Sequence, residues 1–447
     1  MPTTTRSAAH EVRRSQAATA EASPGRLDHA LFAGFCAVLL FGPLAFGAVE
    51  PWSIFAQQVG AVLLLLLWAA RQLAAGRLSL PYNPLYPPML LLGAMVAIQL
   101  ALGLSAYRYA TWTESLRYVA YALLVLVASQ VLGWREGMKR FALVLSVFGF
   151  LVAVFAIVQD LAPNGKLYWI REPRVAGWMF GPYVNHAHYA GLMEMLTPFP
   201  LVLALTSHFS GAKRILIAFA AVVMGGSIFF SGSRGGMMAF AAEVLFLAWA
   251  LSRRQKQAER RTLLVLIAVV LLTVVFLGVF ARERVFQQIA TLNSPLAESV
   301  TGMRLHIDRD GLRMFAARPL LGWGLGTFPY FYPQFRTFYT NTFINQAHND
   351  YLQFLVEMGG LGFAACLWFV VALLYHGVKR SAHWQESLTH AVRMAALAGC
   401  TGLLVHSFFD FNLQVPANAA LFYVLAATAT AAREDHNVIL WPQEKAA

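Results

Sequence analysis

The chain has 447 residues, of which 58% are hydrophobic and only 13% are charged. Ordinary soluble domains are about 45–50% apolar and about 25% charged, so this composition excludes a large soluble enzyme. Long apolar runs fill most of the length, which also excludes a fibrous or disordered protein. Because a helix needs about 20 residues to cross a membrane, the sequence predicts an all-α polytopic membrane protein.

Twelve apolar runs of transmembrane length follow residues 1–29, which we interpret as a disordered cytoplasmic tail. Nine runs lie within residues 30–280 and three within 351–432, and residues 433–447 are predicted to form a second cytoplasmic tail. The runs cover about 30–48, 52–70, 85–104, 112–132, 141–160, 188–206, 215–231, 235–252, 262–280, 351–376, 389–411 and 417–432.

The net charge of +12 is distributed unevenly between these runs. The connections after the second, fourth, sixth, eighth and tenth runs hold two to five Lys or Arg residues each, whereas those after the first and eleventh hold none. Positive connections face the cytoplasm. Both termini are therefore predicted to be cytoplasmic, and the other connections to lie on the outer side.

Arg234 lies in a short outer turn of Gly and Ser residues, 231–236, between the seventh and eighth runs. One interpretation is a snorkelling arginine that caps a helix hairpin. The other is anion capture, in which exposed backbone N–H groups and the positive end of the next helix assist the guanidinium. A phosphate bound at that depth would belong to a lipid.

Residues 281–350 form one long outer loop, which holds seven arginines, four acidic residues and no lysine between 281 and 346. An amphipathic helix is predicted over 303–317, ended by Pro319. Arginine without lysine favours forked recognition of phosphate or carboxylate, although pairing with acids of the loop is the alternative. The following run Gly322-Trp-Gly-Leu-Gly326 is expected to be flexible or tightly turned backbone near the site.

Several histidines lie on the same outer side. His348 directly precedes the tenth run, where it is either structural or a general base or orienting donor. His406 and Asp410 are four residues apart at the end of the eleventh run, a spacing that would let them bond each other on one helix face. His186 and His188, which precede the sixth run, fall on different helix faces and make a poor metal site.

Glu194, Glu243 and Glu357 fall within the apolar runs. Intramembrane acids are functional candidates by default, but each is also explained by protonation or hydrogen bonding in the bundle, and we interpret Glu243 as structural. The sequence has no P-loop, Asp-x-Asp cluster, zinc pattern or Gly-x-Ser-x-Gly elbow. We expect no metal, no cofactor and no nucleic-acid partner. The most specific reaction that these residues permit is a metal-free reaction on a phosphate-bearing lipid, in which arginines neutralise a leaving diphosphate.

Five segments, in this order, resemble the O-antigen ligase and O-antigen polymerase superfamily of bacterial inner-membrane glycosyltransferases. They are residues 181–188, 231–236, Arg304 with 319–328, 347–353 and 406–416. The resemblance covers the fifth to twelfth runs, and the first four match only in hydropathy. By motif position it implies that Arg234 and Arg304 bind the diphosphate and that His348 is the essential histidine. Where many relatives carry Trp, this chain has Asp308. The further substrate-binding candidates are Arg309, Arg313, Asn185, His188, Asn349, Tyr351, His406 and Asp410.

The resemblance implies a lipid-carrier glycosyltransferase (GT-C-like) fold in which the periplasmic loop 281–350 lids a cavity. It implies a metal-independent, inverting transfer of a glycan from undecaprenyl diphosphate, at the periplasmic face of the inner membrane. The acceptor stays open: lipid A–core for a ligase, or a lipid-linked repeat unit for an O-antigen or exopolysaccharide polymerase. The alternative is a transporter or flippase of lipid-linked oligosaccharide, which the missing internal repeat and the one-sided polar residues disfavour.

Overall fold

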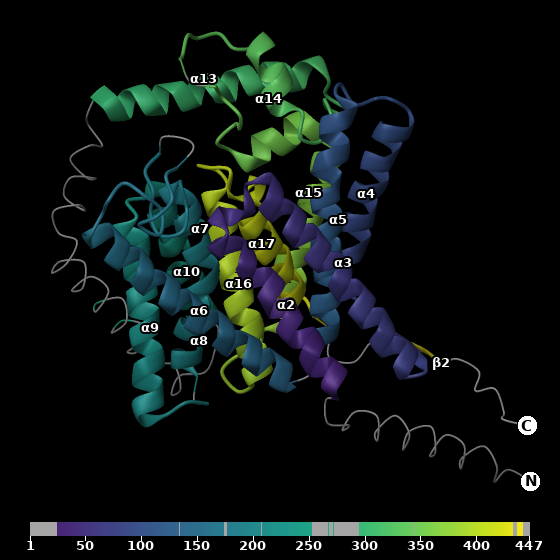
Figure 1. Cartoon of the computed structure of the whole chain (residues 1–447), viewed down its shortest axis with the longest axis vertical. Coiled ribbons are helices and arrows are strands. Elements are labelled where there is room, and N and C mark those ends of the chain that lie inside the picture. The colour runs from purple at the N-terminus through teal and green to yellow at the C-terminus, as the bar shows by residue number, and fades with distance from the viewer. Residues whose placement is uncertain are drawn as a thin grey trace, which may run out of the picture.

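The computed structural model describes residues 25–133, 135–173, 177–206, 208–252, 267, 271, 295–341, 343–431 and 436–440. Within these ranges the chain is a helical bundle with one helix, α13 (Pro295–Ala317), lying across one end, here called the α13 end (Figure 1). The bundle helices are α2 (Arg26–Leu44), α3 (Pro51–Ala74), α4 (Tyr86–Ala101), α5 (Arg108–Val131), α6 (Arg135–Leu161), α7 (His186–Leu196), α8 (Pro198–Leu205), α9 (Gly211–Phe230), α10 (Arg234–Ser252), α15 (Asp350–Arg380), α16 (Leu388–His406) and α17 (Pro416–Ala429).

Eight of the described helices are long and apolar enough to cross a membrane: α2, α3, α5, α6, α9, α10, α15 and α16. Helices α4 and α17 are apolar but shorter. The prediction of a multi-pass helical membrane protein is therefore confirmed, whereas a count of twelve spans is not. The predicted span 262–280 lies outside the described residues, apart from 267 and 271.

The single span predicted over 188–206 is two short helices, α7 and α8. The break falls at Thr197, because Pro198 begins α8 and a proline cannot donate the backbone hydrogen bond that would continue α7. Nearly every residue of both helices is buried, and they pack against α16 and α9. The broken helix therefore lies in the centre of the bundle, with its first residue near the α13 end.

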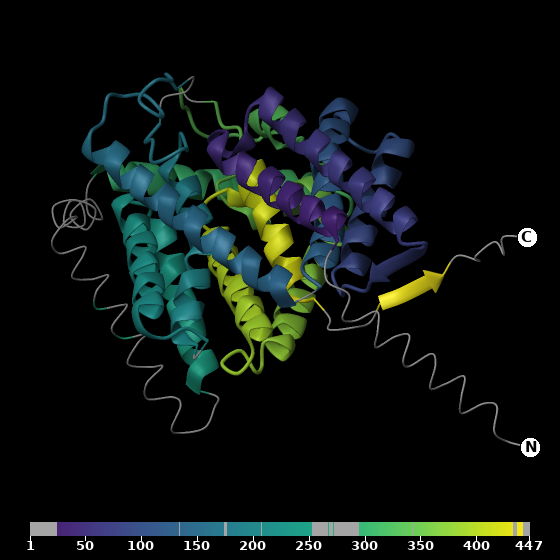
Figure 2. The same cartoon turned by 60° about the horizontal axis from the view of Figure 1, so that its bottom comes forward.

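The bundle has two flanks that are separated by α16 and α17. Helices α9 and α10 lie on one flank and α4 and α5 on the other in both views (Figures 1 and 2). A ligand bound beside α10 therefore approaches the middle of the bundle from the opposite side to one bound beside α5.

The amphipathic helix predicted over 303–317 is confirmed by α13, which starts earlier and ends two residues before Pro319. Its buried Ile307 and Met314 belong to an apolar cluster with Phe328 of α14 (Phe328–Phe331) and Leu352 of α15. The next turn, η3 (Tyr332–Gln334), adds a buried tyrosine to the same cluster. The outer helix is thus held on the first turns of α15 by hydrophobic packing.

The glycine run after α13 is tightly turned. Gly322, Gly324 and Gly326 have φ values of +71°, +110° and +72°, which only glycine adopts at little cost. A Cβ at Gly322 would lie 2.4 Å from the carbonyl oxygen of Glu357 in α15. The Glu357 carboxylate in turn accepts two backbone hydrogen bonds from this segment, at 2.8 and 3.1 Å. Glu357 therefore anchors the loop to α15.

Two short strands, β1 (Arg77–Pro81) and β2 (His436–Leu440), pair antiparallel away from the α13 end (Figure 1). Residues 436–440 fall within the predicted tail 433–447, so that segment is not entirely irregular. In the part of the chain that the structure describes, this pair is the only sheet in an otherwise helical fold.

Candidate active site

His348 lies immediately before α15 in a backbone conformation that histidine rarely adopts. Its φ is +54°, in the left-handed region, where a bulky residue is strained. The next residue, Asn349, caps α15, and its side-chain oxygen accepts a hydrogen bond from the backbone N–H of Leu352 at 3.2 Å. The imidazole is therefore presented at the entrance of the helix, with 32% of the side chain exposed.

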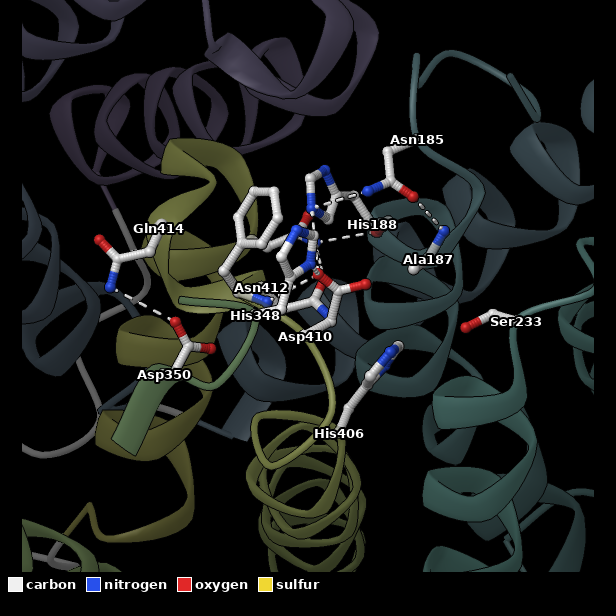
Figure 3. A network of polar contacts seen from close by, with 12 residues as sticks. Asn185, Ala187, His188, Ser233, His348, Asp350, His406, Asp410, Asn412 and Gln414 are labelled. Carbon is white, nitrogen blue, oxygen red and sulfur yellow. Dashed lines mark hydrogen bonds and ion pairs between the residues drawn. The ribbon is translucent and has the colours of Figure 1, made fainter. Parts of the chain in front are cut away.

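Two distant segments bring polar side chains to His348 (Figure 3). Asp410, in the turn after α16, places Oδ1 3.3 Å from Nδ1 of His348 and 4.0 Å from Nε2 of His188. The side chain of Asn185 caps α7 and lies 3.3 Å from the same Nε2 of His188. The ring of Phe411 contacts both imidazoles edge-on. We call Asn185, His188, His348 and Asp410 the His–Asp cluster.

The Asp410 carboxylate is the charged centre of the His–Asp cluster. Burial alone raises the pKa of this carboxyl, but the hydrogen bond with His348 and the nearby His188 and His406 outweigh it, so the pKa lies below its usual range. Oδ1 also accepts a hydrogen bond from the backbone N–H of Phe411 at 2.9 Å. Asp410 is therefore an anion at neutral pH that favours a proton on Nδ1 of His348 and leaves Nε2 for other partners.

The expected bond between His406 and Asp410 is wrong. The backbone N–H of Asp410 donates to the carbonyl oxygen of His406 at 3.1 Å, but helix α16 ends at His406 and the two side chains have different partners. Nδ1 of His406 instead lies 2.8 Å from Oε1 of Glu194 in α7, and both side chains are fully buried. His406 thus belongs to a second polar pair beneath the His–Asp cluster.

Arg234 is the first residue of α10 and is half-buried. Ser233 precedes it, and its hydroxyl accepts a hydrogen bond from the backbone N–H of Gly236 at 3.1 Å. Gly235 lies directly against His406: a Cβ there would be 2.7 Å from Cδ2 and Nε2 of the ring. The positive end of the α10 dipole and the Arg234 charge therefore lie next to the residues that surround Asp410.

Arg304 is half-buried on α13, and its charge acts on Asp308 of the same helix and on His186 of α7. Burial raises the pKa of Asp308, one turn further along, and Arg304 and a hydrogen bond with Asn349 oppose that rise. Burial lowers the pKa of His186 at the start of α7, and Arg304 adds to this effect. Arg304 therefore lies near the start of α7, and its neighbour Asp308 bonds to Asn349, next to His348.

Arg309 and Arg313 are exposed on α13. Nη1 of Arg313 lies 3.4 Å from Oδ1 of the buried Asp310, which also accepts a hydrogen bond from the backbone N–H of Thr337 at 2.9 Å. Arg313 is therefore paired with an acidic residue of the same loop, which is the alternative to anion binding. Among the described residues, neither arginine has a contact with the His–Asp cluster.

Tyr351, in the first turn of α15, bonds to α16. Its hydroxyl donates to the backbone carbonyl of Leu404 at 2.7 Å. With Asp350 and Gln414 it lines part of an apolar cavity of about 1570 Å³ between α4, α5, α15 and α17. Gly93 of α4 also lines this cavity, and the space where its Cβ would stand is open.

The role of Glu194 was not predicted beyond its being an intramembrane acid. Its partner His406 is 212 residues away in the sequence, and no local spacing connects the two. Glu243, which we interpreted as structural, is buried against Gly402 of α16, and neither of its carboxylate oxygens has a hydrogen-bond partner among the described residues.

Comparison with known proteins bears on the same segments. No curated protein matches the chain. Residues 219–367 match the family described as O-Antigen ligase. The matched region includes α10, α13 and the first half of α15, and so contains Arg234, Arg304 and His348. This match confirms the resemblance to the O-antigen ligase and polymerase superfamily over residues 219–367, and it supports an enzyme of ligase or polymerase type.

Proposed function

We propose that the protein transfers a glycan from undecaprenyl diphosphate to an acceptor hydroxyl, by a metal-independent, inverting reaction at the periplasmic face of the bacterial inner membrane. The observation that carries the proposal is the His348–Asp410 pair, at 3.3 Å, beside the elements that carry Arg234 and Arg304. The predicted cytoplasmic location of the positively charged connections supports the orientation.

In this proposal the two arginines hold the diphosphate. A guanidinium binds phosphate oxygens in a planar, two-pronged geometry and keeps its charge at any physiological pH. Arg234 adds the positive end of α10, and Arg304 approaches from the outer helix α13. Together they would stabilise the negative charge that builds up on the leaving diphosphate, the task that a metal ion performs in other glycosyl transfers.

His348 is proposed as the general base. Asp410 faces Nδ1 of His348, so a proton held on Nδ1 leaves Nε2 as the acceptor atom. The acceptor hydroxyl gives its proton to Nε2, and its oxygen forms a bond to the anomeric carbon. The bond between that carbon and the phosphate oxygen breaks, and undecaprenyl diphosphate leaves. Attack opposite the leaving group inverts the anomeric configuration.

The apolar cavity between α4, α5, α15 and α17 supports a lipid-linked substrate. Its walls are almost entirely hydrophobic, and Asp350 and Gln414, near the turns of His348 and Asp410, line part of it. A hydrocarbon chain would fill such a space favourably. Because α10 lies on the other flank (Figures 1 and 2), we assign this cavity to the lipid chain of the acceptor.

The acceptor defines the type of enzyme. With lipid A–core as acceptor the protein is a ligase, and with a lipid-linked repeat unit it is an O-antigen or exopolysaccharide polymerase. The lipopolysaccharide pattern of a deletion strain distinguishes them. Long glycans left on the carrier indicate a ligase, and lipopolysaccharide capped with a single repeat indicates a polymerase.

The direct test is reconstitution of the purified protein with an undecaprenyl-diphosphate glycan and each acceptor, with EDTA present throughout. We expect transfer to one acceptor, and a loss on the order of 100-fold in kcat for Arg234→Ala, as for removal of one oxyanion donor. Full transfer by Arg234→Ala would overturn the assignment of the diphosphate site. Transfer that stops with EDTA and returns with a divalent cation would overturn metal independence.

A further inference from the structure

Glu194 and His406 form a buried polar pair that the proposed reaction does not use. Nδ1 of His406 lies 2.8 and 3.1 Å from the two carboxylate oxygens of Glu194. The side chains are 1% and 0% exposed. Removing charged groups from water is costly, and two apolar residues would fill this space without that cost. A pair of this kind is therefore better explained by the geometry it imposes than by the stability it adds.

The first turn of α10 rests directly on this pair. A Cβ at Gly235 would lie 2.7 Å from Cδ2 and Nε2 of His406, and one at Gly236 would lie 2.6 Å from Cβ of Ala190 and 3.0 Å from Oε1 of Glu194. Real Cβ atoms essentially never approach another atom below 3.0 Å. The double glycine thus lets the backbone of α10 contact both members of the pair. His406 is the last residue of α16, and its ring extends toward the turn of Ser233 (Figure 3).

Arg234 is the residue immediately before the double glycine, so its Cα position depends on where this first turn sits. The pair joins α7 to the end of α16, and the glycines join α10 to the pair. A shift in the Glu194–His406 distance would therefore move the backbone of Arg234 relative to Asp410, four residues after His406.

We propose that Glu194 and His406 are positioning residues that fix the first turn of α10 and thereby aim Arg234 at the diphosphate. This inference rests on the proposed function, in which Arg234 binds the diphosphate. It assigns His406 a role through Arg234 and not through direct contact with the substrate.

The test is a double-mutant cycle, with undecaprenyl diphosphate as the probe and its Kd for the protein in nanodiscs as the readout. His406→Asn removes the imidazole, and Gly235→Ala leaves the pair intact but places a methyl group against it. We expect each to weaken binding about tenfold, and neither to weaken it further when Arg234 is already alanine. Glu194→Gln, which retains a hydrogen-bonding oxygen, should restore most of the affinity that Glu194→Ala loses.

Gly225→Ala is the matched control, because it also adds a methyl group against α10, 3.1 Å from the ring of Phe240. Its Kd should stay within twofold of the wild type. If His406→Asn and Gly235→Ala weaken binding equally with and without Arg234, or not at all, the positioning role is overturned while the proposed function stands. If Arg234→Ala itself leaves the Kd unchanged, the diphosphate assignment is overturned, and the positioning role with it.

Discussion

Replacing Asp410 by asparagine removes the charge that faces His348 while keeping the shape of the side chain. The two interacting atoms are 3.3 Å apart, and Asp410 is 4% exposed. At this distance Coulomb's law gives about 5 kcal/mol with an effective dielectric constant of about 20, and about 1 kcal/mol in bulk water. Because 32% of the His348 side chain is exposed, we expect an intermediate loss of about 3 kcal/mol in stabilisation of the imidazolium. That corresponds to a decrease of about 100-fold in kcat.

The assay is single-turnover glycan transfer by purified, reconstituted protein at saturating donor. Asp28→Asn provides the matched control, since it makes the same chemical change in the ion pair with Arg71, which joins the start of α2 to the last turn of α3. We expect the control to retain its wild-type rate. If Asp410→Asn keeps more than a third of the wild-type kcat, Asp410 does not support proton transfer to His348.

Four further predictions follow from individual contacts. Arg304→Ala should lower transfer on the order of 100-fold, whereas Arg309→Ala, on the exposed side of the same helix, should change it less than threefold; equal losses would contradict the assignment. Gly93→Phe fills open space in the apolar cavity, so the KM for a long-chain acceptor should rise about tenfold while that of a short-chain analogue stays constant; a parallel rise in both would exclude the lipid role. Gly322→Ala combines a φ of +71° with a contact of 2.4 Å and should destabilise the protein by about 2 kcal/mol, measured as a lower melting temperature in detergent; an unchanged temperature would show that the loop is not docked on α15. The pKa of Asp410 is lower in the folded than in the unfolded state, so its contribution to stability is complete above about pH 5 and declines below about pH 4. The difference in melting temperature between the wild type and Asp410→Asn should therefore shrink from pH 7 to pH 3. A difference that grows over this range would show that folding does not lower the pKa of Asp410.

Hydropathy and charge predicted the helices well because both follow directly from the membrane environment. An apolar run of about 20 residues has few alternatives to a helix in lipid. The same reasoning did not locate the break between α7 and α8. Pro198 is visible in the sequence, but prolines occur inside membrane helices as well as between them. Only the structure, in which α7 ends at Leu196 and α8 begins at Pro198, shows that the helix is interrupted there.

The alternation of positively charged connections with connections poor in Lys and Arg predicted that His348, His188 and Asp410 lie on the same side of the membrane. Which of them pair could not be predicted, because pairing depends on where each helix ends. The spacing of His406 and Asp410 suggested a bond between their side chains, but α16 ends at His406, whose ring pairs with Glu194 of α7. The chain then turns, and Asp410 faces His348 instead.

The directions of the arginine side chains in the long loop could not be predicted from the sequence either. Their composition predicted anion binding, yet the direction of each side chain depends on how α13 lies on the bundle. Arg304 is half-buried near Asp308, and Arg313 is exposed beside Asp310. Helical periodicity alone gives the relative directions of these side chains, and only the packing of Ile307 on α15 fixes which of them face inward.

The most direct test of the central claim is the release of undecaprenyl diphosphate by the reconstituted protein in EDTA, with wild-type His348 and with His348→Asn. Asparagine tolerates the left-handed backbone at this position, so the substitution removes the base without distorting the turn. We expect one undecaprenyl diphosphate released for each glycan transferred by the wild type, and a decrease in both on the order of 1000-fold in the variant. Release and transfer at the wild-type rate by His348→Asn would contradict the account.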